Sequence, residues 1–142
     1  MGDRMRLQLL PRSRGSGGSQ TVRSYFDFVA DRQSVLNAIG WVGADLVTPL
    51  GWGTGEYQAI TIAELLRDVQ PALPSGRTPI YVCPECGDIS CGAITVRIGR
   101  EGNFITWSDF AHENGYAAAR KIDAEVMSFD AREYRAAIAA IR

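Results

Sequence analysis

The feature that most restricts the fold of this 142-residue chain is an alternation of apolar and polar side chains over residues 93–98. A period of two is typical of a strand with one buried face, so the two isoleucines and the valine are expected to point inward. Thr95 and Arg97 are then expected on the opposite, solvent-facing side. Strands that bury only one face favour an antiparallel sheet.

Neighbouring segments extend this strand into a meander. Residues 99–103 (GREGN) contain the glycine and asparagine typical of a hairpin turn, and an apolar strand pattern resumes over residues 104–110. Residues 79–83 precede the alternating segment and also favour a strand. Aromatic and β-branched side chains over residues 24–29 predict a further strand earlier in the chain.

The clearest helix signal covers residues 130–141. Asp130 is a favoured N-cap and Glu133 follows three residues later, which is the spacing of a capping box. Phe129 just before the cap and Tyr134 in the first turn have the spacing of a hydrophobic staple. Both signals predict that a helix begins here.

Two other helices are expected. Thr61, with a glutamate three residues later, forms a second capping-box pattern and predicts a helix over residues 61–69. A short apolar face that ends at a glycine predicts a helix over residues 32–39. Residues 116–120 also have a helical pattern, whereas residues 125–129 are compatible with an extended segment.

These elements predict a single α+β domain over residues 21–142, with one antiparallel sheet of four or five strands and about three helices packed on one face. Residues 1–20 differ in composition. Four arginines and one aspartate give them a charge of +3, which leaves −4 for the rest of a chain of net charge −1. Their Gly/Ser-rich end predicts a flexible basic arm, with an edge strand at residues 5–10.

The composition argues against several classes of protein. The near-zero net charge is unlike that of a polycationic nucleic-acid binder. No run of about 18 apolar residues is present, so no membrane-spanning segment is expected, and no secretory signal pattern is evident. The three cysteines are odd in number and all lie between residues 83 and 91, unlike a secreted disulfide framework. A cytoplasmic location is therefore expected.

The cysteines are the one group with an evident chemistry. Cys83 and Cys86 lie in the motif Cys-Pro-Glu-Cys-Gly, which has the form of a zinc knuckle because the final glycine allows the chain to reverse with a positive φ. Cys91 begins the next strand, and His112, the only histidine, lies just past the last strand of the meander. These four residues predict a structural zinc site with three thiolates and one imidazole.

Other interpretations of the same residues stay open. Cys83 can face the core as a small apolar side chain, while Cys86 and Cys91 occupy a turn that requires glycine. If no protein side chain fills the fourth position, a zinc-bound water could support hydrolysis. Redox chemistry of Cys83 and Cys86, or a reversible disulfide between Cys86 and Cys91, is a further alternative, although a strand and not a helix follows the motif.

A single histidine, the lack of a nucleophile–base pair and the lack of a cofactor loop favour a non-catalytic protein. Trp41 and Trp52 lie in a glycine-rich segment and could present a surface to a protein partner, because tryptophan is frequent at binding hot spots. Alternatively, both fill the side of a small core. We expect a small cytoplasmic binding module of an immunity or regulatory kind, with a metal- or thiol-dependent enzyme as the alternative.

Three segments resemble a group of small bacterial proteins that is common in actinomycetes and has no established activity. They are the cysteine motif CPECGDISCG, the segment WSDF at residues 107–110, and the C-terminal FDAREY at residues 129–134. The resemblance extends over residues 77–138. It implies that Gly87, Asp88 and Gly92 fix a turn geometry or build a surface, and it gives Cys83 and His112 less weight.

Overall fold

The computed structural model describes residues 4–41 and 44–141, so residues 1–3 of the expected arm lie outside it. In chain order the elements are β1 (Leu7–Arg14), β2 (Arg23–Ala30), β3 (Gln33–Ser34), α1 (Val35–Ala38), α2 (Gly55–Leu65), β4 (Thr78–Tyr81), the 3-10 turn η1 (Ile89–Cys91), β5 (Ala93–Glu101), β6 (Phe104–Glu113), β7 (Arg120–Lys121), β8 (Met127–Asp130) and α3 (Ala131–Ala139). The expected α+β fold class is confirmed.

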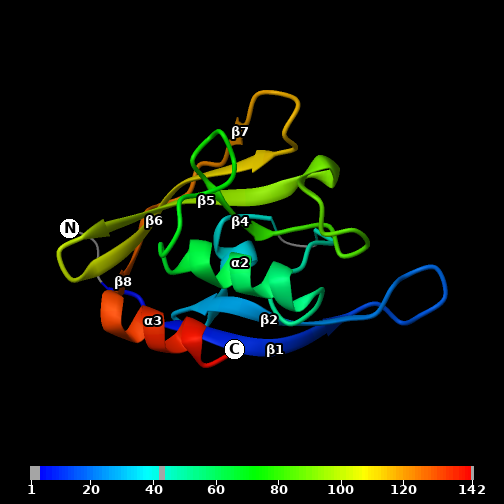
Figure 1. Cartoon of the computed structure of the whole chain (residues 1–142), viewed down its shortest axis with the longest axis horizontal. Helices are drawn as coiled ribbons and strands as arrows, with labels where there is room; N and C mark the ends of the chain where they lie inside the picture. Colours follow the sequence, from blue (N-terminus) through cyan, green and yellow to red (C-terminus); the bar gives the residue numbers. More distant parts are fainter. Residues whose placement is uncertain (1–3, 42–43, 142) are drawn as a thin grey trace.

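The strands form two antiparallel sheets, where one sheet was expected. β1, β2 and β3 form a three-stranded sheet, and β4, β5, β6, β7 and β8 form a five-stranded sheet in which β7 and β8 pair with different stretches of β6. Figure 1 shows the two sheets as separate layers, with α2 across the front of the space between them. The sheet divides because β2 pairs with β1 and β3 and not with the meander.

Residues 7–14 form β1 instead of belonging to a flexible arm. The strand pairs along its whole length with β2, and it extends beyond the expected edge strand at residues 5–10. Arg12 Nε lies 2.8 Å from a carboxylate oxygen of Asp27, whose side chain is 4% exposed. A flexible basic arm was expected, but this arginine of the arm forms an ion pair with a buried aspartate.

The helix expected over residues 32–39 is shortened to α1. Asp31 and Arg32 both have positive φ, 49° and 72°, and form a two-residue hairpin turn between β2 and β3. The Asp31 carboxylate accepts a hydrogen bond from the Arg6 backbone N–H at 2.8 Å. Since both turn residues have left-handed backbone conformations, a helix cannot begin at them.

The expected start of the second helix is wrong. α2 begins at the N-cap Thr54, whose hydroxyl accepts the Tyr57 backbone N–H at 3.1 Å, so Thr61 lies inside the helix and not at its cap. The helix ends at Leu65, shortly before Arg67 adopts a φ of 59°. Thr54 caps the helix two turns earlier than the Thr61 pattern indicated.

The meander is present, with one error in its expected faces. β5 and β6 are joined by a two-residue turn at Gly102 and Asn103, and Arg97 is exposed as expected. Thr95 was expected on the solvent side but is 0% exposed. Its hydroxyl donates a hydrogen bond to the Glu113 carboxylate at 2.5 Å, and Ser75 donates to the same oxygen at 3.0 Å. The segment containing Ser75 therefore covers this part of the second face.

The C-terminal helix forms as expected. The Asp130 carboxylate accepts the Glu133 N–H at 3.0 Å, and the Phe129 and Tyr134 rings are in contact, with centroids 5.7 Å apart. The Tyr134 hydroxyl donates to the Leu65 carbonyl at 2.6 Å and accepts from Trp107 Nε1 at 3.2 Å. These side chains form the centre of a core to which both sheets and all three α-helices contribute.

A helix was expected over residues 116–120, but residues 116–119 form an irregular segment and Arg120 begins β7. The Asn114 side-chain oxygen accepts the backbone N–H groups of Tyr116 and Ala117, both at 3.0 Å, and this local turn replaces the first turn of a helix. Residues 127–130 are extended as β8. In the part of the chain that the structure describes, no helix combines the length and apolar character needed to cross a membrane.

Candidate metal centre

The loop between β4 and β5 brings the three cysteine side chains together. The Sγ atoms of Cys83, Cys86 and Cys91 all lie within 4.8 Å of one another, and the last two are 2.9 Å apart. Cys83 is half-buried, whereas Cys86 and Cys91 are exposed, and all three are free thiols. Among residues 4–41 and 44–141, these three form the one group of histidine, cysteine or acidic side chains close enough to share a metal ion.

The backbone of the loop directs hydrogen-bond donors at the sulfur atoms. The N–H of Asp88 donates to the Sγ of Cys86 at 3.4 Å, and the backbone N–H groups of Cys86 and Glu85 lower the pKa of the Cys83 thiol. Gly87 donates its N–H to the Cys83 carbonyl at 2.8 Å and has a φ of 70°, as expected for the glycine of a knuckle. Such N–H donors favour the thiolate form, which is the form that binds metal.

A second turn brings Cys91 close to Cys83 and Cys86. The Asp88 carboxylate accepts the Ser90 N–H at 3.0 Å and caps the short turn η1 that carries Cys91. Gly92 then has a φ of 95°, and a Cβ at this position would lie 2.8 Å from Nε2 of His112. Asp88 thus caps this turn, and Gly92 supplies the positive φ that follows it.

The thiols differ in their affinity for a proton. Partial burial raises the pKa of Cys83, but hydrogen bonds from the backbone of Cys86 and Glu85 and from the side chains of Cys86 and Cys91 together lower it more, so the net shift is downward. The hydrogen bond to Cys86 raises the pKa of Cys91 to about 11. The thiolate therefore forms more readily at Cys83 than at Cys91. A divalent cation would compete with protons for these sulfurs and favour the thiolate forms.

One side of the loop is fixed by the first hairpin. Arg14, at the end of β1, donates to the Glu85 carboxylate at 2.6 Å and to both oxygens of Asp45. The Thr21 hydroxyl donates to the other Glu85 oxygen at 2.6 Å. These contacts anchor the residue between the first two cysteines to a segment far away in sequence.

Trp52 packs against the cysteine loop. Its indole N–H donates to the Thr48 carbonyl at 2.9 Å, and the guanidinium of Arg23 lies 4.3 Å from the centre of its ring. Arg23 in turn donates to the backbone carbonyls of Pro84 and Glu85. A Cβ on Gly87 would lie 3.0 Å from the Trp52 ring, so a larger residue would not fit at this position without a shift.

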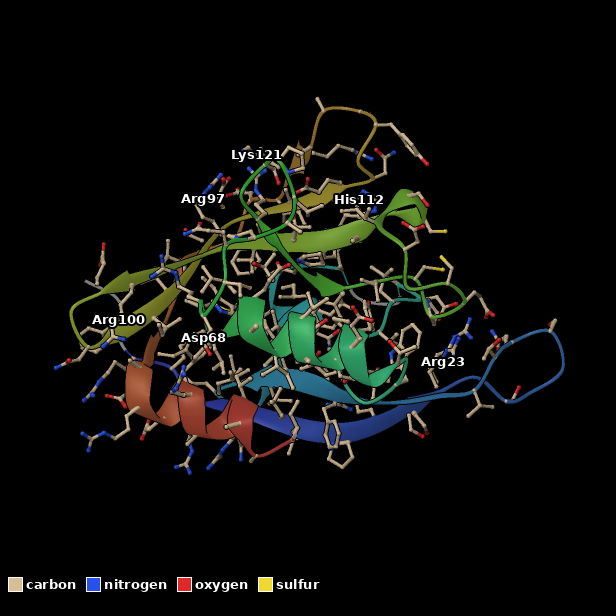
Figure 2. All side chains as sticks on the ribbon, viewed as in Figure 1. Arg23, Asp68, Arg97, Arg100, His112 and Lys121 are labelled. Atoms are coloured by element: carbon tan, nitrogen blue, oxygen red, sulfur yellow. The ribbon has the colours of Figure 1, made fainter. Side chains whose placement is uncertain are left out.

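His112 lies at the same end of the molecule but outside the group of three thiols. It pairs with Ile94 across β5 and β6, and its ring stacks on Trp41 with centroids 5.0 Å apart and an interplanar angle of 7°. Figure 2 shows the yellow sulfur atoms at one end of the molecule, with His112 on the β6 side of them and Arg23 on the β2 side. The structure thus brings together three of the four expected ligands.

Sequence reasoning missed Arg14, Thr21 and Arg23, which hold the cysteine loop. No local pattern marks them, because each contacts the loop across more than 60 residues. Trp41 and Trp52 were noticed for their residue type, and both are half-buried against other side chains.

The donor set fits a soft divalent cation. Three thiolates are typical ligands of zinc, and tetrahedral zinc would take one further ligand from outside this group. Comparisons of the chain with family models, curated proteins and solved structures gave no match. The function must therefore be argued from the site itself.

Proposed function

We propose that this protein is a small cytoplasmic binding module in which Cys83, Cys86 and Cys91 hold a structural zinc ion. The observation that carries the proposal is the convergence of three Sγ atoms within 4.8 Å, on a loop whose Asp88 N–H donates to one of them. The loop also has positive side chains beside it, because Arg14 and Arg23 both contact it. Positive charge close by favours a cluster of thiolates.

A structural role for the metal is favoured over catalysis because no general base lies in the thiol cluster. The only histidine stacks on Trp41, and the Asp88 carboxylate caps η1. Residues 85–91 include the exposed Glu85, Cys86, Asp88, Ser90 and Cys91, which a protein partner can contact. Free thiols in this number also fit a reducing compartment.

A metal-dependent hydrolase is the second candidate, and one observation favours it. The three-ligand group leaves the fourth position of a tetrahedral ion without a protein ligand, as in catalytic zinc sites that bind water. Activated-ester hydrolysis by zinc-loaded protein that is lost in Cys86→Ser and retained in Ser90→Ala would favour this candidate over the binding module.

Metal content tests the proposed site. We expect about one zinc ion per chain in protein purified without chelator, and none in the variant Cys86→Ser. Ser90→Ala is the matched control, because it removes an exposed hydroxyl from the same loop without removing a thiol. Zinc-free wild-type protein that does not take up added zinc would contradict the proposal, as would equal zinc content in all three proteins.

The binding role is tested with the same variants. Affinity capture from host cells should retain a partner on the zinc-loaded wild type and on Ser90→Ala, and lose it on Cys86→Ser. A partner retained equally by all three proteins would place the interaction surface away from the loop.

A further inference from the structure

The three thiols of the cysteine loop differ in their access to solvent. Cys86 and Cys91 are exposed, whereas Cys83 is half-buried. The two exposed side chains are also in contact, because their Sγ atoms lie 2.9 Å apart. A thiol is readily oxidised to a disulfide when it is accessible and has a second thiol within reach. Cys86 and Cys91 meet both conditions, so they have the arrangement of an oxidisable pair.

Hydrogen bonds within the protein hold this pair of cysteines opposite each other. Cys86 follows Glu85, whose carboxylate accepts a hydrogen bond from Arg14 at 2.6 Å. Cys91 lies in the short turn η1, which the Asp88 carboxylate caps. The two sulfur atoms of a disulfide are about 2.05 Å apart, so this pair needs to close by only about 1 Å. Neither anchoring contact involves a sulfur atom, so the bond can form while both contacts stay in place.

We propose that a disulfide between Cys86 and Cys91 forms under oxidising conditions and releases the zinc ion, so that the loop is a redox-controlled metal site. This inference rests on the proposed zinc site and adds the regulation of that site. A cysteine in a disulfide is no longer a ligand, because zinc binds the thiolate. Oxidation therefore removes two of the three protein ligands. The single thiolate that is left, Cys83, is too few for a structural zinc site, which takes four ligands.

The oxidant is a low-molecular-weight disulfide, and the reaction consists of two thiol–disulfide exchanges. In the first exchange, one exposed cysteine thiolate attacks a sulfur of the small disulfide, whose S–S bond breaks and releases one small thiolate. In the second, the other cysteine thiolate attacks the cysteine sulfur of this mixed disulfide, forms the Cys86–Cys91 bond and expels the second small thiolate. The two cysteines thus lose two electrons to the small disulfide. The two expelled thiolates take up two protons from solvent, and Zn²⁺ leaves.

Peptide mapping after treatment with oxidised glutathione tests the pairing of the cysteines on the full chain without added zinc. The main intramolecular disulfide should join Cys86 to Cys91. Cys83→Ser keeps the exposed pair and should form the disulfide at about the wild-type rate. Cys91→Ser leaves the half-buried Cys83 as the only partner of Cys86, and it should form a disulfide at least about fivefold more slowly.

Three results of this mapping would overturn the proposal. They are a wild type that forms no intramolecular disulfide, a wild type in which the main disulfide joins Cys83 to Cys86, and equal rates of disulfide formation in Cys83→Ser and Cys91→Ser. If one of the variants does not fold, the disulfide mapped in the wild type decides.

Zinc release tests the coupling between the disulfide and the metal. Zinc-loaded wild type treated with oxidised glutathione should release about one zinc ion per chain to a colorimetric zinc indicator, in step with disulfide formation. Dithiothreitol should restore zinc binding. Ser90→Ala should behave like the wild type, because it keeps all three thiols. Zinc that stays bound after the disulfide has formed, or zinc release without a disulfide, would overturn the proposal.

The two experiments separate this inference from the proposed function. A reduced wild type that takes up no zinc contradicts the proposed zinc site, and the redox control of that site with it. A wild type that binds zinc, but in which Cys86 and Cys91 do not pair on oxidation, contradicts the redox control alone.

Discussion

Trp107, in the aromatic core, and Trp52, beside the cysteine loop, are held in place by different kinds of contact. Trp107 is 0% exposed and packs edge-to-face on Phe28, Phe129 and Tyr134. Trp52 is half-buried, and its ring contacts a guanidinium and lies against the loop glycine. The first tryptophan is held by apolar burial and the second by polar contacts around a loop with exposed thiols. The difference separates the part of the molecule that makes the fold from the part that is available for function.

The two kinds of contact differ in how much they contribute to the free energy of folding. Burial of a large apolar side chain stabilises a fold by about 1.5–3 kcal/mol, whereas an exposed ion pair contributes about 0–1 kcal/mol. Arg14 contacts the loop through an ion pair with Glu85, and Arg23 contacts it through hydrogen bonds to two backbone carbonyls, which are also small contributions. The stability of the loop therefore depends more than that of the core on a ligand that binds only the folded state.

The largest expected effect is at the aromatic centre. Trp107→Ala removes the side chain that contacts three other buried aromatic rings and leaves a cavity, so we expect the free energy of unfolding to fall by about 3–5 kcal/mol. Urea unfolding measures this change, and Trp52→Ala, at the half-buried tryptophan, should cost less. Equal losses in the two variants would contradict the distinction between the two regions.

Zinc should produce the next largest change, and only through the loop. A ligand at a concentration of 100 times its Kd stabilises the folded state by about 2.7 kcal/mol. We expect added zinc to raise the free energy of unfolding of the wild type and of Ser90→Ala, and a chelator to reverse this. The value for Cys86→Ser should not respond to zinc. A response of Cys86→Ser equal to that of the wild type would place the metal elsewhere.

A third prediction concerns a hydrogen bond within the core. Tyr134→Phe keeps the ring but leaves the Leu65 carbonyl and Trp107 Nε1 without their partner. Loss of this buried partner should lower the free energy of unfolding by about 1–3 kcal/mol, with no effect on zinc content. Thermal unfolding and metal analysis of the same sample check both parts. A change in zinc content would mean that the two regions are coupled.

The smallest expected effect is a pH dependence of the stability that Glu85 contributes through the cysteine loop. The Thr21 hydroxyl and Arg14 lower the pKa of Glu85 from 4.5 to about 2. A lowered carboxyl pKa stabilises the folded state above the unfolded value, so this contribution should be present above about pH 4.5 and disappear as the pH falls toward 2. Carboxyl-carbon NMR should give a midpoint near 2 for Glu85.

Substitution of the arginine identifies the cause of that shift. Arg14→Gln should move the Glu85 midpoint upward, whereas Arg6→Gln, at an exposed arginine just before β1, should leave it unchanged. A midpoint near 4.5 in the wild type would contradict the anchoring of the loop by the first hairpin.

The sequence patterns that succeeded describe contacts between residues close together in the chain. The capping box at Asp130 and the knuckle glycine Gly87 depend on neighbours within about five residues, and the meander depends on strands that follow one another in the chain. The cluster of three cysteines was predictable for the same reason, since one turn and one short loop bring them together.

The features that were missed depend on distant segments. Thr95 is buried because the segment around Ser75 covers its face of the sheet, and no alternation pattern contains that information. β1 is ordered by its pairing with β2, although the adjoining Gly/Ser-rich stretch predicted a flexible arm. His112 is at the expected end of the fold, but its ring stacks on Trp41, outside the thiol group. The burial of Glu64 inside α2 also required the structure, because its side chain had been interpreted as part of a cap.

The central claim is that the cysteine loop is a metal site built on a core that folds by apolar burial. Anomalous diffraction at the zinc edge, from crystals grown with zinc, tests it most directly. The account predicts one anomalous peak about 2.3 Å from the Sγ atoms of Cys83, Cys86 and Cys91. No peak at these sulfurs, or a disulfide between Cys86 and Cys91 in the presence of reductant and zinc, would contradict it.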